Sequence, residues 1–165
     1  MRKPIIPVPD IKLDSIYKLK PEFLLEAGIS LLVLDLDNTL APYSHPIPNA
    51  QLRSWVDGMK EAGVELFILS NNHGSRPERF ANELCLDYLD RARKPSAKKL
   101  LQVLREKGIS PEKAAIIGDQ IYTDVICGKR AGVLTIIVKP IELTNPLLAI
   151  RYGLEIPFRL IKKRK

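Results

Sequence analysis

Cysteine is scarce in this sequence. Its 165 residues include only Cys85 and Cys127, and these two form neither a Cys-x-x-Cys pair nor a spacing typical of a metal site. The sequence therefore excludes a disulfide-stapled secreted scaffold and a zinc module. We expect two reduced thiols, as is usual in a cytoplasmic protein.

Long hydrophobic runs are also lacking. No apolar stretch approaches the ~18 residues that a membrane-spanning helix needs. The first ten residues, MRKPIIPVPD, are basic but interrupted by three prolines, so they do not match a secretory signal. The sequence contains no internal repeat, low-complexity tract or clear interdomain linker. It therefore predicts a single domain over residues 1–165, long enough for a real core.

Acidic residues are fewer than basic ones, and the formal net charge is +7. The excess is concentrated in residues 151–165, which contain one acid, Glu155, and six basic side chains. These six are Arg151, Arg159, Lys162, Lys163, Arg164 and Lys165. Six bases against one acid give this segment a net charge of +5, which leaves +2 for residues 1–150. The basicity is therefore mainly a property of the C-terminal segment.

What the sequence does contain is an alternation of apolar runs and helical stretches. Strand-like runs occur at 30–34, 64–69, 113–118 and 133–138, with a weaker one at 86–90, and helical stretches at 48–62, 75–84, 95–107 and 122–131. Residues 1–13 predict extended chain, and residues 14–27 predict short helices. This alternation indicates βαβ units. We predict an α/β fold, a three-layer Rossmann-like parallel sheet with helices on both faces. Its core covers about 28–140, and a basic extension covers about 141–165.

Polar segments stand where the predicted strands end or where the next helix begins. They read DLDNT at 35–39, SNN at 70–72, RKP at 93–95 and DQIYTD at 119–124. Open parallel sheets bind ligands beyond the carboxyl ends of their strands. We therefore expect three carboxylates, a hydroxyl with neighbouring backbone N–H groups, and a lysine to converge at one edge of the sheet.

This set of groups suits phosphoryl transfer through an aspartyl phosphate. One carboxylate attacks phosphorus as the nucleophile, while a second acid donates a proton to the leaving oxygen and then takes one from water. Mg²⁺ prefers oxygen ligands and offsets the repulsion between neighbouring carboxylates. The hydroxyl, amide and ammonium groups bind the remaining phosphate oxygens. Acids clustered at strand tips are thus reasonable once a divalent cation is added.

The four segments resemble, in order, the four motifs of the haloacid dehalogenase (HAD) superfamily of phosphohydrolases, over roughly residues 28–140. The first motif implies that Asp35 is the nucleophile and Asp37 the acid/base. The second implies that the Ser70 hydroxyl and the Asn71 backbone amide bind phosphate. The third implies that Lys94 binds phosphate as well.

The fourth motif, GDQIYTD, implies Mg²⁺ as the cofactor. Asp119 is the implied metal ligand, and Asp124 binds through water or supports the ligands from outside. Asp35 and the backbone carbonyl of Asp37 complete the metal site that the resemblance implies.

The gaps between the motifs leave no room for a substantial cap domain. An open site suits a phosphate attached to a macromolecule or a membrane lipid. The motif combination is similar to the IIIA-type, YqeG-like branch, whose mitochondrial relatives remove phosphate from phosphatidylglycerophosphate. The leading hypothesis is therefore a phosphatidylglycerophosphate phosphatase. One departure is Lys129, where this branch more often has Asn, and we expect its effect in helix packing or in a contact outside the four motifs.

The C-terminal segment leaves two interpretations open. Apolar residues recur there at near-helical spacing among basic side chains, at Leu147, Ile150, Leu154, Phe158 and Ile161. Such a segment suits either contact with an anionic membrane surface or docking on the domain with its charged end in solvent. Gly153 and Pro157 are expected to interrupt a helix here. The expected localisation is cytoplasmic, with peripheral contact at the inner face of the membrane under the first interpretation.

Two other functions remain open at this point. A second phosphatase interpretation gives the site a soluble sugar phosphate, nucleotide or phosphoprotein as substrate. The third interpretation, from a different class, is a nucleic-acid- or ribosome-binding protein that uses the basic segment and keeps the site as a relic. The complete motif set argues against the relic, so nucleic acid is not the expected partner.

Overall fold

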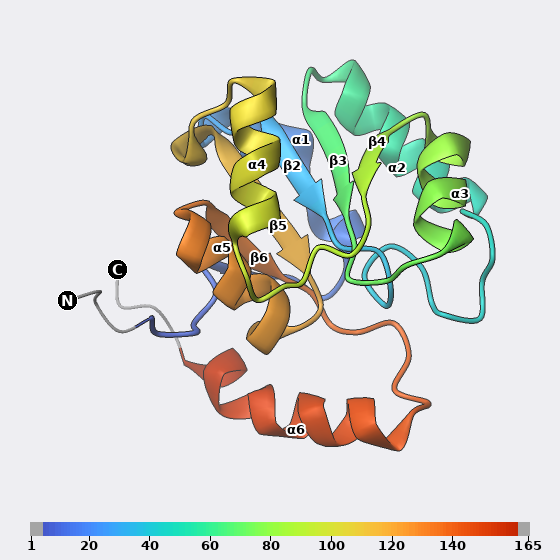
Figure 1. The fold of residues 1–165 in the computed structure, drawn as a ribbon, viewed down its shortest axis with the longest axis vertical. Coiled ribbons are helices and arrows are strands. Elements are labelled where there is room, and N and C mark those ends of the chain that lie inside the picture. Colours follow the sequence, from blue (N-terminus) through green and yellow to red (C-terminus); the bar gives the residue numbers. More distant parts are fainter. Residues whose placement is uncertain (1–4, 162–165) are drawn as a thin grey trace.

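The computed structural model describes residues 5–161, so Lys162, Lys163, Arg164 and Lys165 of the predicted basic extension lie outside the described residues. Six strands form one sheet in the order β1-β6-β5-β2-β3-β4 (Figure 1). They are β1 (Ile11–Lys12), β2 (Leu31–Leu34), β3 (Glu65–Leu69), β4 (Asp87–Leu89), β5 (Ala114–Gly118) and β6 (Leu134–Ile137). Every pairing is parallel. The central strands therefore end at one common edge, as predicted.

Helices cover both faces of this sheet. One face is packed by α1 (Pro21–Glu26), α2 (Ala50–Glu61) and α3 (Ser75–Leu84), and the other by α4 (Lys98–Lys107) and α5 (Ile126–Ala131). In β2, Leu32 and Leu34 belong to the first core, whereas Leu31 and Val33 belong to the second. Because successive side chains of a strand point to opposite faces, one apolar run serves both cores. The predicted three-layer α/β architecture is confirmed.

Local signals explain where the helices begin and end. Asn49 caps α2 by accepting the backbone N–H of Leu52 at 2.8 Å. Gly108 ends α4 with a φ of 65°, a left-handed conformation that glycine adopts at low cost. The helix predicted at 122–131 is a π-helical turn, η3 (Ile121–Val125), followed by α5. Two short 3-10 turns, η1 (Ile16–Lys18) and η2 (Pro111–Lys113), complete the helical segments before α6.

One expectation about the C-terminal segment is wrong. We expected Gly153 and Pro157 to interrupt a helix, but α6 (Pro146–Leu160) continues through both. Both residues are exposed, so the carbonyl that loses its N–H partner at the proline can bind water instead. None of the helices within residues 5–161 combines the length and the hydropathy needed to span a bilayer.

The carboxyl edge of the sheet is left open. Between β2 and β3 the chain forms only the loop 35–49, α2 and a short turn, and between β3 and the RKP segment it forms only short loops, α3 and β4. The expected absence of a substantial cap therefore holds for the whole stretch from the first motif to the third.

Candidate active site

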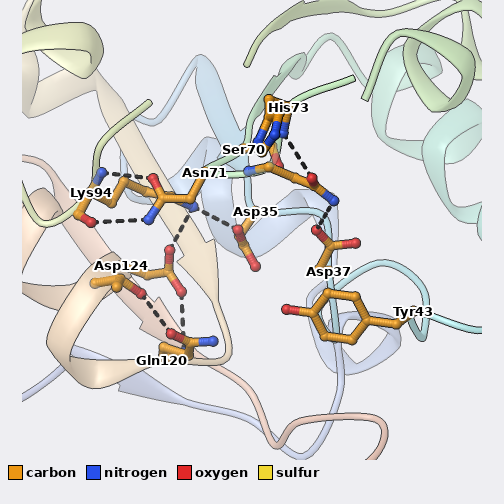
Figure 2. A pocket seen from close by; sticks show the side chains of 11 residues that line it. Asp35, Asp37, Tyr43, Ser70, Asn71, His73, Lys94, Gln120 and Asp124 are labelled. Carbon is orange, nitrogen blue, oxygen red and sulfur yellow. Dashed lines mark hydrogen bonds and ion pairs between the residues drawn. The ribbon is translucent and has the colours of Figure 1, made fainter. Parts of the chain in front are cut away.

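A cavity of about 300 Å³ lies at the carboxyl edge of the sheet. Asp35 follows β2, Ser70 follows β3 and Asp124 lies in the turn after β5. The cavity is lined by Asp35, Asp37, Tyr43, Ser70, Asn71, Asn72, His73, Lys94, Gln120, Thr123 and Asp124 (Figure 2). Six of the seven predicted site residues thus line one cavity, and the seventh, Asp119, has a carboxylate oxygen within 4.8 Å of those of Asp35 and Asp124.

The segment after β2 presents Asp35 to the cavity. The chain turns sharply here because Asn38 takes a φ of 61°, and the Asn38 side-chain amide pairs with the backbone of Glu142 at 2.9 and 3.2 Å. One carboxylate oxygen of Asp35, Oδ2, accepts the Thr39 hydroxyl at 2.8 Å, and the other accepts Lys94 Nζ at 2.6 Å. These contacts fix the orientation of the Asp35 carboxylate.

Asp35, Asp119 and Asp124 form a buried acidic cluster. Each offers a carboxylate oxygen, and these oxygens lie within 4.8 Å of one another. Burial, followed by the negative charge of Asp35, raises the pKa of Asp119 well above its ordinary value and the pKa of Asp124 to about 6. Such oxygen-only, mutually repelling groups are the donor set that a hard divalent cation requires.

Gly118, at the end of β5, makes room for this cluster. A Cβ added at Gly118 would lie 2.3 Å from the carboxyl group of Asp124, a distance that no packing tolerates. Glycine is therefore needed here for close approach rather than for an unusual φ. The close packing of Asp124 therefore requires the glycine of the GD pair in the fourth motif.

Lys94 is a buried cation between two acids. Its side chain is 1% exposed, and Nζ lies 2.6 Å from Asp35 and 2.7 Å from Asp124. Burial acts to lower the pKa of the Lys94 ammonium, but the charges of Asp124 and Asp35 outweigh it and hold the pKa above the usual lysine value. Lys94 therefore stays protonated and offsets part of the negative charge of the cluster.

Asn71 positions the backbone of Lys94. Its side-chain amide donates to the Lys94 carbonyl at 3.0 Å and accepts the Lys94 N–H at 2.7 Å. The sequence predicted only a backbone contact between Asn71 and phosphate. Ser70, buried beside it, accepts the N–H of Asn72 at 3.0 Å through its hydroxyl oxygen, which leaves the hydroxyl hydrogen available to a ligand in the cavity.

The carboxylate of Asp37 lies apart from the acidic cluster. It accepts Arg76 Nε at 2.7 Å and the Asn72 side-chain amide at 3.1 Å. Arg76, in the first turn of α3, also donates to the backbone carbonyls of Pro42 and His45. The predicted metal contact of Asp37 was through its backbone carbonyl, so this side-chain arrangement leaves the carboxylate for another role.

Three residues near the cavity that hold the predicted carboxylates were not predicted from the sequence. They are Thr39, which bonds Asp35, and Arg76 and Asn72, which bond Asp37. The only signals were that Thr39 and Asn72 lie inside the DLDNT and SNN motifs. Lys129, which departs from the branch pattern, lies outside the cavity lining, and its Nζ is 2.7 Å from Asp10. It therefore ties α5 to the N-terminal segment.

Comparisons with known proteins agree with this geometry. A family model described as mitochondrial PGP phosphatase matches residues 1–142. The protein named "Probable phosphatase YqeG" from Bacillus subtilis (strain 168) is 32% identical over 158 residues, covering 96% of this chain and 91% of that protein. Phosphatidylglycerophosphate phosphatase 1, chloroplastic/mitochondrial, from Arabidopsis thaliana is 25% identical over 166 residues, covering 94% of this chain and 47% of that protein.

Solved structures share the fold. The 3-deoxy-D-manno-octulosonate 8-phosphate phosphatase from Moraxella catarrhalis, solved with magnesium ion, phosphate ion and KDO, aligns with a TM-score of 0.51 at 19% identity. The alignment covers 84% of this chain and 92% of that one. At this identity the likeness shows the fold alone.

Proposed function

The chain belongs to the mitochondrial PGP phosphatase family of HAD-superfamily phosphatases, and from this premise we propose that it is a Mg²⁺-dependent phosphatidylglycerophosphate phosphatase. The observation that carries the proposal is the convergence of Asp35, Lys94 and two further acids beside an open cavity. A phosphomonoester in this cavity would meet a fixed carboxylate and a buried ammonium at the same point.

In the proposed reaction, Asp35 is the nucleophile. One of its carboxylate oxygens forms a bond to phosphorus while the bond from phosphorus to the ester oxygen breaks. Asp37, in its acid form, gives a proton to that leaving oxygen. Asp37 then takes a proton from a water molecule that attacks the aspartyl phosphate, and inorganic phosphate leaves as the Asp35 carboxylate is restored.

The remaining polar groups position the phosphoryl group. The Ser70 hydroxyl and the Asn71 backbone N–H donate to its oxygens, and Lys94 neutralises negative charge from within the site. Lys94 is well placed for this role because its ammonium already contacts Asp35. Thr39 keeps the other Asp35 oxygen oriented, so the attacking carboxylate does not need to rotate during the reaction.

The residues present fit a divalent cation. The carboxylates of Asp35, Asp119 and Asp124 and the backbone carbonyl of Asp37 would hold it, with Asp124 acting directly or through water. When bound, Mg²⁺ neutralises carboxylate and phosphoryl charge. The raised pKa values of Asp119 and Asp124 are consistent with this assignment, because burial and then the negative charge of Asp35 make their ionised forms costly, and a bound cation offsets that cost.

The proposed substrate is a lipid phosphate for two reasons. The site lacks a cap, so a headgroup can enter while its acyl chains stay outside. In addition, the family match and the named Arabidopsis relative both concern phosphatidylglycerophosphate. The proposed location is cytoplasmic, with peripheral contact at the inner face of the membrane where such a substrate lies.

The test is a substrate screen of the wild type and Asp35→Asn, with an exposed acid on α2, Asp57, changed to Asn as the matched control. Phosphate release is measured from phosphatidylglycerophosphate, a sugar phosphate, a nucleotide and a phosphopeptide, with Mg²⁺ and after its removal by EDTA. We expect the wild type to release phosphate fastest from the lipid. The rate of Asp35→Asn should be lower by roughly a thousandfold or more, and the rate of the control should equal that of the wild type. Activity that survives in Asp35→Asn would contradict the assignment of Asp35 as nucleophile. Preference for a soluble substrate would contradict only the proposal of a lipid substrate.

A further inference from the structure

Helix α6 has an inverted distribution of polar and apolar residues. Helices on a protein surface normally bury their apolar side and expose charge. In α6 the buried residue is Glu155, which is 1% exposed. Its carboxylate accepts the backbone N–H groups of Ile121 and Tyr122 at 2.9 and 3.3 Å and pairs with Arg159 at 2.9 Å. The charged side of the helix is thus the side that docks on the domain.

The opposite side, which we call the outer face of α6, is entirely nonpolar. Its exposed residues are Pro146, Leu147, Ala149, Ile150, Gly153, Leu154, Ile156, Pro157 and Leu160. Leu147 is 71% exposed, and Ile150 and Leu154 are each 63% exposed. A continuous apolar surface of this kind marks an interaction site in a folded protein.

A second feature adjoins the outer face. A groove of about 520 Å³ runs between α6 and the N-terminal segment, and we call it the basic groove. Lys12, Lys18 and Lys139 line it together with two residues of the outer face, Ile156 and Leu160. The only acid in its lining is Asp14, which pairs with Lys139 at 2.6 Å. Apolar surface and excess positive charge therefore meet along one helix.

This arrangement also lies beside the catalytic cavity. Figure 1 shows α6 lying across the end of the molecule toward which the strand arrows point. Gln120 lines the catalytic cavity and also a smaller pocket whose other wall is formed by Arg151, Tyr152 and Glu155 of α6. The helix therefore packs against the same turn that borders the catalytic cavity.

We propose that the outer face of α6 and the basic groove form the surface by which this protein lies on an anionic lipid bilayer. The apolar side chains would enter the boundary between headgroups and acyl chains, and the lysines would meet lipid phosphates. The inference deepens the proposed function and rests on it, because it brings the cavity to the headgroup layer, where a lipid phosphomonoester lies.

Charge favours a bilayer over a second copy of the chain. Two copies joined through their outer faces would bring two basic grooves together, and like charges repel. In the sequence, Ile161 and then four basic residues, 162–165, follow the helix and add positive charge to this part of the chain. An anionic lipid surface complements the apolar outer face and the basic groove at once.

The test is flotation of the full chain with vesicles of phosphatidylcholine alone, or of phosphatidylcholine and phosphatidylglycerol in equal parts. The variant is Ile150→Gln with Leu154→Gln, which removes apolar surface without changing charge. The matched control is Phe23→Gln with Leu25→Gln on α1, since these side chains are 43% and 44% exposed. Circular dichroism verifies folding. We expect salt-sensitive binding to the anionic vesicles only, at least tenfold weaker in the α6 variant and unchanged in the control.

Hydrolysis of soluble p-nitrophenyl phosphate separates this inference from the proposed function. We expect the α6 variant to keep wild-type hydrolysis of this substrate. If the wild type bound anionic vesicles but did not hydrolyse p-nitrophenyl phosphate, the proposed function alone would be overturned. Equal vesicle binding by wild type and variant, no vesicle binding by wild type, or a dimer in light scattering that the α6 variant abolishes would each overturn the docking surface.

Discussion

The guanidinium of Arg159, in α6, donates a hydrogen bond to the backbone carbonyl of Asp119. The same side chain donates to the Val138 carbonyl at 3.1 Å and pairs with Glu155. Because Glu155 in turn accepts the N–H groups of Ile121 and Tyr122, the two charged residues hold the start of the turn that carries Asp119 and Asp124. A helix outside the four motifs therefore positions the residues of the fourth.

Replacing Arg159 with Met tests this role. The change leaves the Glu155 carboxylate buried without its cation, so we expect a loss of roughly 3 kcal/mol in the free energy of unfolding. Adding Glu155→Gln removes the buried charge and should recover part of that loss. Arg53→Met is the control, because Arg53 pairs with Glu83 at the surface and should cost less than about 1 kcal/mol. Urea unfolding gives the free energy of unfolding of all three variants. Equal decreases for Arg159→Met and Arg53→Met would contradict the positioning role of Arg159.

Gly118→Ala tests the packing of the acidic cluster. The new Cβ has no room beside Asp124, so we expect displacement of that carboxylate, a destabilisation of about 1–3 kcal/mol and weaker activation by Mg²⁺. The control is Gly58→Ala in the middle of α2, where no atom lies within 4 Å of the added Cβ. That change should stabilise by about 0.5–1 kcal/mol. Mg²⁺ titrations of activity that coincide for the two variants would rule out the steric explanation.

The acidic cluster predicts how Mg²⁺ stabilisation depends on pH. The pKa of Asp124 is raised from 3.8 to about 6, and that of Asp119 is raised in the same direction. Between these values the folded protein binds more protons than the unfolded chain, so the stability of the metal-free protein falls as pH rises through this window. Mg²⁺ removes the repulsion that develops there and competes with protons for the same oxygens.

We therefore expect saturating Mg²⁺ to raise Tm by roughly 3–8 °C at about pH 7.5. At about pH 5, where Asp124 is mostly protonated, the rise should be less than half as large. Thermal unfolding with and without EDTA gives both values. K⁺ at matched ionic strength controls for screening, and a pH-independent Mg²⁺ effect would mean that the cation binds elsewhere.

Much of this site was predictable because the sequence indicates where the buried strands end. The apolar runs before Asp35, Ser70 and Asp119 are buried on both faces, and parallel strands bring the residues after their carboxyl ends to one edge. The contact between Arg76 and Asp37 was not predictable, because 39 positions separate them and nothing local marks Arg76 as part of the site. The strand β1 is only two residues long and shows no periodic pattern.

The orientation of α6 was the larger surprise. Periodicity finds the apolar stripe of a helix but does not say which side meets the domain. Leu147, Ile150 and Leu154 of the predicted stripe are exposed, whereas Phe158 turns inward and meets the Tyr122 ring at 6.0 Å. The buried Glu155 reverses the usual rule, and the N–H groups at the start of η3, together with Arg159, explain why an acid belongs there.

Asp37→Asn separates the two chemical steps. In the proposed mechanism Asp37 protonates the leaving oxygen first and deprotonates water second. p-Nitrophenolate leaves without a proton, so the variant should still form the aspartyl phosphate from p-nitrophenyl phosphate but hydrolyse it slowly. We expect a burst of about one nitrophenol per site, followed by a steady rate roughly 10²–10⁴-fold below wild type. Rapid-quench kinetics measures both phases.

Leaving-group dependence gives the sharper comparison. An alkyl phosphate needs the proton in the first step, so Asp37→Asn should show no burst with it and should lose more activity than with the nitrophenyl ester. Asp35→Asn provides the contrast, because a variant without the nucleophile should show no burst with either substrate. Asp37→Asn keeps one side-chain oxygen, which can still accept Arg76 Nε, and loses the acceptor for Asn72. Because the partly buried guanidinium contact remains, folding should persist. If both substrates lose activity equally and neither gives a burst, Asp37 acts only in placing Arg76 and Asn72, and another group moves the proton.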